Sequence, residues 1–230
     1  LISPAAAAAN RDMSLKGKNV RARLRPESNC GAEKHRQIAF IGDTVDDLEL
    51  VAYADANFAE RESSYSTGGG LVALVGPYSY FPLTGSSKKH GAASHSTVEA
   101  ELVSLSKVMR EQAIPLLDLW EAIAPSFSSS AVSPLHGDGA ASGPWSKIIV
   151  YEDNQATAKI VQTGKFRKMA HIHRVHGVHL QFLHDSVRRG IYELRDCHTR
   201  VMAADIFTKF FIDAAKWDNA IKELFLVSKR

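Results

Sequence analysis

The order of its apolar segments constrains the fold of this chain more than any other feature of the sequence. Three short β-rich runs come first, at LELVAYADA (48–56), GGGLVALVG (68–76) and YSYFPL (78–83). Gly, Pro or Ser residues separate each run from the next, as is typical of tight turns between strands. Three consecutive strands joined by short turns predict an antiparallel meander.

Helical and strand patterns alternate after this meander. A helix is predicted from about Ser96 to Gln112 or beyond, and Pro115 suits the first turn of a continuation. The later elements are a buried strand at KIIVYED (147–153), a helix at NQATAKIVQ (154–162), an amphipathic helix at HGVHLQFLHDSVRR (176–189), a strand at IYELRD (191–196) and a helical C-terminal region from AADIFTKFF (203–211) to Arg230. This order predicts an α/β fold with a mixed five-stranded sheet, its first three strands antiparallel, flanked by helices.

The chain is expected to divide into a lead-in and one domain. Residues 1–45 show little periodicity and are typical of a linker or a weakly ordered segment. Residues 46–230 form the domain, and its 45% hydrophobic content, taken over the whole chain, is ample for a core. A flexible insertion is predicted at 126–146, which is heavy in Ser, Gly, Ala and Pro.

Composition argues against several protein classes. No run approaches the ~18 apolar residues of a membrane helix, and the alanine run near the start lacks the Met and basic segment of a signal peptide. Cys30 and Cys197 do not have the spacing of a disulfide framework or a zinc site. The formal charge of +3 is compatible with a polyanion partner but does not require one. We therefore expect a globular intracellular protein, cytoplasmic or nuclear and not secreted.

Four carboxylates fall where sites form in such sheets. Asp55 lies late in the first strand and Glu101 in the first helix; Asp153 ends the fourth strand and Asp205 begins a helix. Four acids in one cleft would repel one another unless divalent cations offset their charge. Oxygen ligands select Mg²⁺ or Mn²⁺, and two such ions about 3.5–4 Å apart promote phosphodiester hydrolysis.

Three of these acids also have an ordinary structural interpretation. Asp55 fits a turn at a strand end, Asp153 a helix N-cap, and Asp205 the N-terminal dipole of its helix. Taken singly, the ordinary interpretations are favoured. The joint occurrence of the acids in this order of elements favours a shared site.

Four motifs carry a family resemblance. In order and spacing, YADANFAE (53–60), SSKKHGAASHSTVEAELVSLS (86–106), VYEDNQATAKIV (150–161) and AADIFTK (203–209) resemble the ribonuclease H (RNase H) region of copia-type (Pseudoviridae) LTR retrotransposon Pol polyproteins. The similarity spans about residues 47–228, and the joint match is far more specific than any single motif.

The resemblance implies a ribonuclease H-like fold and an endonuclease that hydrolyses the RNA strand of RNA/DNA hybrids during reverse transcription. It implies two Mg²⁺ ions as cofactors, with Mn²⁺ as a substitute. It also implies an upstream reverse transcriptase domain of the same polyprotein as partner, and a location in a cytoplasmic virus-like particle or the nucleus. Position by position, the catalytic and metal-binding acids carried over from the family are Asp55, Glu101, Asp153 and Asp205.

The first helix contains two glutamates that cannot both face the site. Glu99 and Glu101 lie about 200° apart around a helix. Glu101 shares a face with Leu105 and Val108, but Glu99 also has apolar neighbours, so geometry alone leaves the choice open. The resemblance selects Glu101 as the metal ligand and leaves Glu99 as a surface or capping residue.

Binding of a hybrid needs positive charge for two backbones and polar groups that read 2′-hydroxyls. The candidates are polar or basic residues before the first helix, after the fourth strand and in the histidine-rich segment: Ser86, Ser87, Lys88, Lys89, His90, Asn154, Gln155 and Arg174. A solvated loop is the alternative interpretation of the two lysines. Arg167, Lys168, Arg188 and Arg189 are more typical of a surface that faces the nucleic-acid backbone.

The histidines favour no zinc site, because the segment from His171 to His184 has no HExxH motif and no Cys partner. His198 is different, since it lies in the loop before Asp205 where many ribonucleases H keep a mobile histidine that assists product release. The resemblance therefore makes His198 an additional catalytic candidate.

Departures from the family pattern keep other functions open. Val201 and Met202 replace an acidic residue and a Gln, so the alternative is a catalytically decayed RNase H-like module that binds nucleic acid or braces a polymerase. A polymerase domain is disfavoured because Ala56 replaces the second aspartate of a Y-x-D-D turn. An integrase of the DDE class should have Glu where Asp205 stands.

Overall fold

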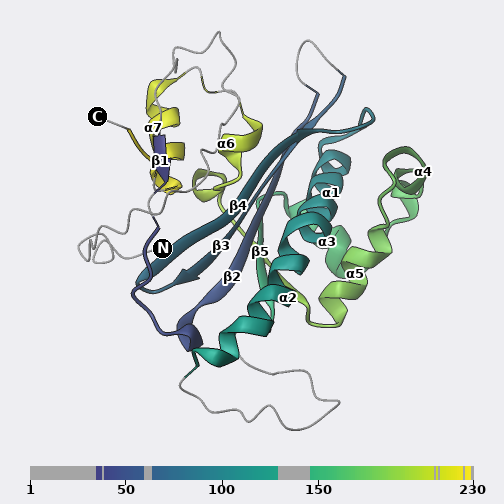
Figure 1. Cartoon of the computed structure of the whole chain (residues 1–230). Coiled ribbons are helices and arrows are strands. Elements are labelled where there is room, and N and C mark those ends of the chain that lie inside the picture. Colours follow the sequence, from purple (N-terminus) through teal and green to yellow (C-terminus); the bar gives the residue numbers. More distant parts are fainter. Residues whose placement is uncertain are drawn as a thin grey trace.

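The protein is described from a computed structural model, in which a twisted sheet lies between two groups of helices (Figure 1). The described residues are 35–37, 39–59, 64–128, 146–209, 211, 213–224 and 226–228. Most of the lead-in predicted at 1–45 and of the insertion predicted at 126–146 lies outside them. None of the described helices has the length and apolar character of a membrane span.

The central sheet has five strands in the order β4-β3-β2-β5-β6. Their bounds are Glu49–Asn57 (β2), Thr67–Gly76 (β3), Ser79–Lys89 (β4), Ile148–Glu152 (β5) and Tyr192–Asp196 (β6). β3 pairs antiparallel with both β2 and β4, whereas β5 runs parallel to both β2 and β6. The predicted fold class, an α/β fold with a mixed five-stranded sheet whose first three strands are antiparallel, is confirmed.

Strand β4 is longer than the pattern at 78–83 predicts. It continues to Lys89, and its polar half pairs with the glycine-rich start of β3, where Gly68 lies opposite Lys88 and Gly69 opposite Ser87. Residues 86–89 therefore form part of an edge strand. The loop part of the alternative interpretation is wrong, but Lys88 and Lys89 are both exposed to solvent. The pattern did not indicate this extension because backbone pairing at a sheet edge needs no apolar side chains.

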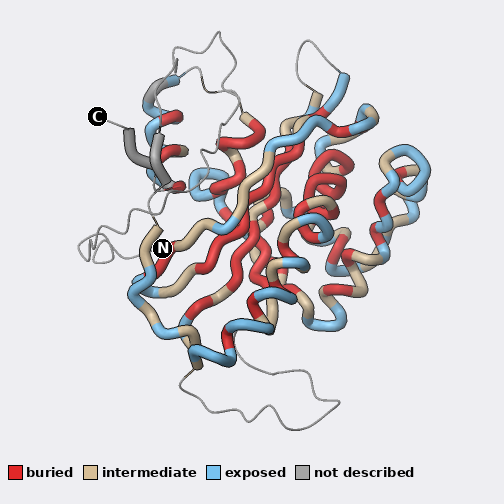
Figure 2. The backbone as a smooth tube through the Cα atoms, in the orientation of Figure 1, coloured by how far each residue is buried: buried red, intermediate tan, exposed pale blue. Residues whose placement is uncertain are grey.

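One face of the sheet is covered by most of the helices (Figure 1). They are α1 (Thr97–Val108), the π-helical segment η3 (Met109–Ala113), α2 (Ile114–Ile123), α3 (Gln155–Thr163), α4 (Ile172–His176) and α5 (Leu180–Arg188). The main core lies between these helices and the sheet and includes Leu50, Leu105, Ile148 and Leu183. Figure 2 shows the buried residues concentrated along the strands and through most of α1.

The π-helical segment follows from a proline in a continuous helix. Pro115 has no N–H and cannot donate a hydrogen bond to the residue four positions back. The N–H of Ile114 bonds to the carbonyl of Met109, which lies five positions back, and α2 then continues the helix. The predicted helix from Ser96 with a continuation at Pro115 is confirmed.

The histidine-rich segment folds as two helices, so the single helix predicted at 176–189 is wrong at its start. α4 ends before Gly177, which has the left-handed φ of 65° typical of a helix C-terminus. α5 begins only at Leu180.

The opposite face of the sheet is covered by α6 (Asp205–Thr208) and α7 (Ala214–Glu223). Leu71 of β3, Phe207 of α6 and Trp217 of α7 belong to a second, smaller core there. The chain then forms β7 (Leu226–Ser228), which pairs antiparallel with β1 (His35–Gln37). The predicted helical region up to Arg230 is therefore wrong at Leu226–Ser228.

Consecutive glycines in β3 let helices approach both faces of the sheet. A Cβ at Gly70 would overlap the Val108 side chain of α1, and one at Gly69 would lie 2.6 Å from Thr208 Cγ2 of α6. Successive strand residues face opposite sides. The absence of side chains here thus brings the helices that carry Glu101 and Asp205 close to the sheet.

Candidate metal centre

Three carboxylates meet at the edge of the sheet where β2 and β5 end. Asp55 belongs to β2, Glu101 to α1, and Asp153 directly follows β5. One ligand oxygen from each lies within 4.8 Å of the others. β2 and β5 are parallel neighbours, so their carboxyl ends share one edge of the sheet, and α1 packs on β2. The sequence-distant acids of this triad are therefore brought together by the sheet topology.

Asp55 is held from two sides. Its side chain is buried, and Oδ2 accepts a hydrogen bond from Thr208 Oγ1 of α6. Its main-chain oxygen accepts a second hydrogen bond from Ser104 Oγ of α1, at 2.8 Å. The turn at a strand end suggested for Asp55 is wrong, because this residue lies within β2 and faces the triad.

Glu101 has an uncompensated oxygen. The residue is 3% exposed, and its Oε2 is buried without a hydrogen-bond partner in the described part of the chain. A buried carboxylate oxygen without a partner is costly unless a cation or a proton satisfies it. This oxygen is therefore open to a cation or a proton at the triad.

Asp153 is not the helix cap considered for it, because the next residue has that role. Asn154 is the N-cap of α3, and its Oδ1 accepts hydrogen bonds from the backbone N–H groups of Ala156 and Thr157. The carboxylate of Asp153 is left to the triad, where its Oδ2 accepts a hydrogen bond from Thr199 Oγ1 at 3.1 Å.

Asp205 lies beside the triad but is not part of it. It begins α6, and its Oδ1 accepts a hydrogen bond from Lys209 Nζ at 2.6 Å. The same ammonium lies 3.9 Å from Asp55 Oδ1. Of the four acids predicted to share a site, the structure therefore brings three together and joins the fourth through Lys209.

Burial dominates the electrostatics of these acids. It raises the pKa of Asp55, against the lowering effects of Lys209 and the Thr208 hydrogen bond. Burial also raises the pKa of Glu101, and nearby Glu152, Asp55 and Asp153 raise it further. The pKa of Asp205 is raised to about 6 by burial, although Lys209 opposes the shift. Without a cation, burial in the folded protein therefore disfavours the charged forms of Asp55 and Glu101.

Glu152 is a further buried acid that the sequence did not single out. Its Oε1 accepts a hydrogen bond from the N–H of Asn154 at 3.2 Å, while Oε2 is buried without a partner among the described residues. Burial raises its pKa well above the usual value, and the charges of Asp153 and Asp55 add to the shift. Glu152 thus adds a further buried carboxyl group, whose charged form is disfavoured, next to Asp153 of the triad.

The donor set fits a hard divalent cation. The triad consists of carboxylates alone, which are the ligands that Mg²⁺ and Mn²⁺ prefer, whereas zinc sites usually include His or Cys. A cation would also satisfy the buried Oε2 of Glu101. Asp55, Glu101 and Asp153 are the residues that would hold it.

We expect stabilisation by Mg²⁺ to increase with pH. In the folded protein the pKa of Asp205 is about 6, above its usual value, so its contribution to stability is present at low pH and lost as pH rises through about 6. Asp55 and Glu101 act in the same direction. Mg²⁺ must displace these protons, so saturating Mg²⁺ should raise Tm by roughly 5–10 °C near pH 8 and by almost nothing near pH 5. Thermal unfolding with Mg²⁺ or EDTA tests this, and an equal shift at both pH values would contradict it.

Glu99 is not a surface residue. It is 1% exposed, and its carboxylate lies 3.1 Å from His171 Nε2 and 2.9 Å from His176 Nε2 of the α4 region. It also accepts a hydrogen bond from the N–H of His95, and its own N–H donates to the N-cap Ser96. Burial alone would raise the pKa of Glu99, but these histidine contacts lower it. The capping part of the prediction is correct, and the surface part is wrong.

The polar residues of β4 do not form a single surface. Ser86 Oγ accepts a hydrogen bond from Gln112 Nε2 and Lys88 pairs with Glu111, so both face the α1 side. Ser87 faces the other side, where its Oγ donates to the carbonyl of Phe207 in α6. Only some of the four β4 candidates can therefore contact one ligand at once.

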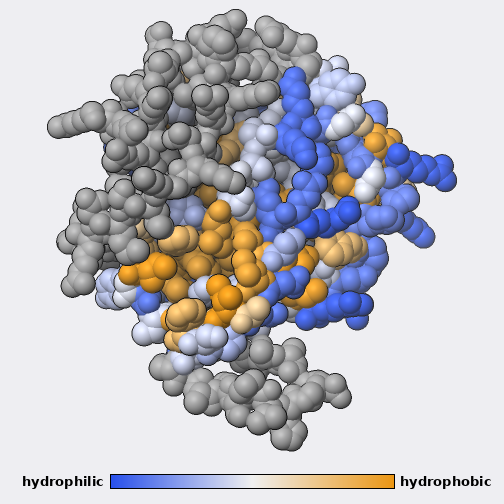
Figure 3. All heavy atoms as spheres, viewed as in Figure 1, coloured by the Kyte–Doolittle hydropathy of each residue, from blue (hydrophilic) through white to orange (hydrophobic). Residues whose placement is uncertain are grey.

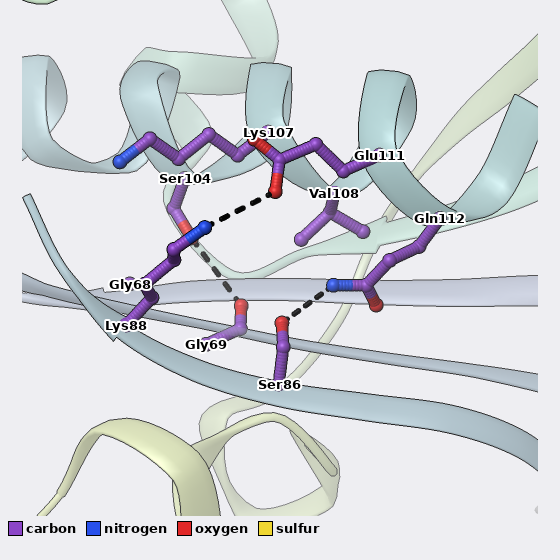
Figure 4. Close-up of a pocket in the computed structure, with 9 residues that line it drawn as sticks. All are labelled: Gly68, Gly69, Ser86, Lys88, Ser104, Lys107, Val108, Glu111 and Gln112. Carbon is purple, nitrogen blue, oxygen red and sulfur yellow. Dashed lines mark hydrogen bonds and ion pairs between the residues drawn. The ribbon is translucent and has the colours of Figure 1, made fainter.

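A small hollow lies between β4 and the end of α1 (Figure 4). Its floor is the backbone of Gly68 and Gly69, and its walls include Lys88 and Lys107. Ser104 links this hollow to the triad, because its Oγ donates to the carbonyls of both Asp55 and Gly69. On the face drawn in Figure 3, hydrophilic side chains gather at the end of the sheet where β2 finishes.

The remaining candidates lie around this edge of the sheet. Gln155 is exposed at the start of α3, and Arg174 is exposed on α4. His198 is also exposed, but its Nδ1 accepts a hydrogen bond from the N–H of Arg200, which turns the ring toward its own loop. Thr199, the next residue, makes the contact with the triad.

The sequence interpretation missed the residues that orient the acids. Thr199 and Thr208 donate to carboxylates, Ser104 fixes the backbone of Asp55, and Lys209 neutralises charge. Thr208 and Lys209 both stand in the quoted motif AADIFTK, where an i,i+4 pair from Asp205 to Lys209 was visible. Ser104 and Thr199 act through contacts between distant segments, so no local pattern indicated them.

Comparison with known proteins adds structural likenesses. No family model matches the chain, and no curated protein sequence matches it. Among solved structures, it is similar to the N-terminal RNase H domain of Rv2228c from Mycobacterium tuberculosis, with a TM-score of 0.45 and 14% identity, over 74% of this chain and 98% of that chain.

Two further structures are similar at comparable levels. One is LC11-RNase H1, isolated from compost by a metagenomic approach, with a TM-score of 0.41 and 15% identity over 73% of this chain and 97% of that chain. The other is the prototype foamy virus protease-reverse transcriptase, with a TM-score of 0.39 and 11% identity over 83% of this chain and 22% of that chain.

Proposed function

We propose that this chain is a metal-dependent endonuclease of the ribonuclease H type that hydrolyses the RNA strand of RNA/DNA hybrids. One observation carries the proposal: Asp55, Glu101 and Asp153 converge within 4.8 Å at the carboxyl edge of the sheet. The unpartnered Oε2 of Glu101 supports a cation there. A structural salt-bridge cluster would instead place a basic side chain against each acid, and Glu101 has none among the described ion pairs.

The proposed chemistry is hydrolysis of a phosphodiester. When bound, Mg²⁺, or Mn²⁺ in its place, would supply the charge that activates a water and stabilises the leaving oxygen. The protein residues position this reaction: Asp55, Glu101 and Asp153 hold the cation, while Thr208 and Thr199 fix the carboxylates of Asp55 and Asp153. Asp205 lies next to Asp55 and is the candidate for a fourth ligand.

The proposed substrate contacts surround the triad. Asn154 commits its oxygen to the helix cap, so its amide nitrogen remains for a phosphate or a 2′-hydroxyl. The side chain of Gln155 is exposed beside it. Lys88, Lys89 and Arg174 supply positive charge for the two backbones.

We further propose a lineage and a setting for the enzyme. The joint match of four motifs supports an RNase H of a copia-type LTR retrotransposon Pol polyprotein. An upstream reverse transcriptase domain of the same polyprotein would then be its partner. The proposed location is a cytoplasmic virus-like particle or the nucleus.

The direct test is a cleavage assay with a labelled RNA/DNA hybrid. We expect RNA fragments in the presence of Mg²⁺, none with EDTA, and no cleavage of the DNA strand or of double-stranded DNA. Cleavage that persists in EDTA would contradict the metal centre. Binding of the hybrid without cleavage in either Mg²⁺ or Mn²⁺ would favour the decayed, non-catalytic module instead.

A further inference from the structure

The side chain of Lys209 lies between the carboxylates of Asp55 and Asp205. Its Nζ is 2.6 Å from Asp205 Oδ1 and 3.9 Å from Asp55 Oδ1. The acids are largely buried, since the side chains of Asp55 and Asp205 are 3% and 15% exposed. Two like charges this close to one another would repel strongly without a cation between them.

The backbone around Lys209 is fixed, but its side chain has room to leave. The Lys209 N–H bonds to the carbonyl of Asp205 at 2.8 Å, and the preceding Thr208 is tied to Asp55. The lysine side chain is 36% exposed. A lysine is a point charge on a flexible four-carbon stem, so its ammonium can swing to solvent without any backbone movement.

The four acids therefore form two positions that a cation can occupy. Asp55, Glu101 and Asp153 form one, with an unpartnered oxygen on Glu101. Asp55 and Asp205 form the other, which Lys209 occupies. The carboxylate of Asp55 is shared between them, as expected of a ligand that bridges two ions.

We propose that the Lys209 ammonium is a built-in cation at the second metal position, so that the chain without nucleic acid binds one divalent ion. A second ion binds only when Lys209 swings away. The proposal rests on the metal centre of the proposed function and adds the order in which two divalent ions bind there. Phosphate groups of a bound nucleic acid would both attract the released ammonium and supply ligands to the second ion.

Other described lysine pairs differ from this one. Lys88 pairs with Glu111 and Lys147 with Glu193, and all four of these side chains are well exposed. Exposed ion pairs contribute little to stability, and these two do not keep a divalent ion out of the candidate site. Lys209 alone among the described lysines contacts two largely buried acids of the candidate site, so its charge competes directly with a divalent ion.

The experiment counts ions. Mn²⁺ is titrated into the whole chain without nucleic acid at pH 8, and the bound ions are counted by calorimetry and by electron paramagnetic resonance. The variants are Lys209→Met, the charge-conserving Lys209→Arg, and the control Lys147→Met, which removes an exposed lysine before β5, away from the carboxyl edge. Thermal unfolding with and without Mn²⁺ shows whether each variant is folded.

We expect one tight ion for the unmodified chain, Lys209→Arg and Lys147→Met, and two for Lys209→Met, with the second at least tenfold tighter than any second ion of the unmodified chain. Lys209→Met should also gain more thermal stability from Mn²⁺ than the others. Equal ion counts and affinities in Lys209→Met and the unmodified chain would overturn the role of Lys209 but keep the metal centre. No ion bound by any variant would overturn both.

Discussion

Asp153→Asn should abolish cleavage of RNA/DNA hybrids and leave the fold intact. The substitution removes a negative ligand from the triad, and we expect the rate to fall at least about 10³-fold, equivalent to about 4 kcal/mol of transition-state stabilisation. Asn has the same size as Asp, and its oxygen can still accept the hydrogen bond from Thr199 Oγ1. Single-turnover cleavage and thermal unfolding measure the two effects separately.

The control is Asp185→Asn, a similar charge change on α5. Asp185 accepts a hydrogen bond from Gln181 within its own helix and does not belong to the triad. Its variant should cleave hybrids at close to the original rate. Undiminished cleavage by Asp153→Asn would rule out the metal centre as the catalytic site.

The two glutamates of α1 should respond oppositely to replacement by Gln. Glu101→Gln should lower the cleavage rate by about 10³-fold or more, because it takes a ligand from the triad. Burial and nearby acids raise the pKa of Glu101, so at pH 8 the ion-free folded state disfavours its charge. The neutral Gln should therefore increase the free energy of unfolding without ions by on the order of 1 kcal/mol.

Glu99→Gln should destabilise the fold and largely preserve cleavage. Its carboxylate is the buried partner of His171 and His176, and hydrogen bonds to a charged group contribute about 1.5–3 kcal/mol. Denaturant unfolding measures this loss, and cleavage per folded molecule should stay within roughly threefold of the original. If both variants lost cleavage equally and neither lost stability, the assignment of the two faces of α1 would be wrong.

Much of the fold follows from local patterns that the sequence carries openly. β2, β3 and β5 are apolar runs inside the sheet, β6 alternates buried and partly exposed residues at one sheet edge, and Pro115 marks the change of helical register. The polar half of β4 is different, because its pairing depends on backbone hydrogen bonds with β3 and not on burial of its side chains. Likewise, Gly177 ends α4 through a single left-handed residue inside an amphipathic pattern.

The candidate site was predictable in its acids but not in their surroundings. The order of elements placed Asp55, Glu101 and Asp153 at one edge, where they meet. The burial of Glu99 depends on histidines more than seventy positions away in the chain, as the separations of 72 and 77 show. Neither helical phase nor residue type could reveal that contact, since both glutamates have apolar neighbours on their own faces.

Pairing of β1 with β7 has a consequence for the order of assembly. His35 lies opposite Ser228 in this two-stranded sheet. The two strands therefore come from the beginning and the end of the described chain. During synthesis β1 leaves the ribosome long before β7 exists, and closing so long a loop is entropically costly and slow. The central sheet can therefore form first, and the joining of β1 to β7 is expected to be the last step. Until then, β1 offers an unpaired edge that a nascent neighbour or a chaperone can bind.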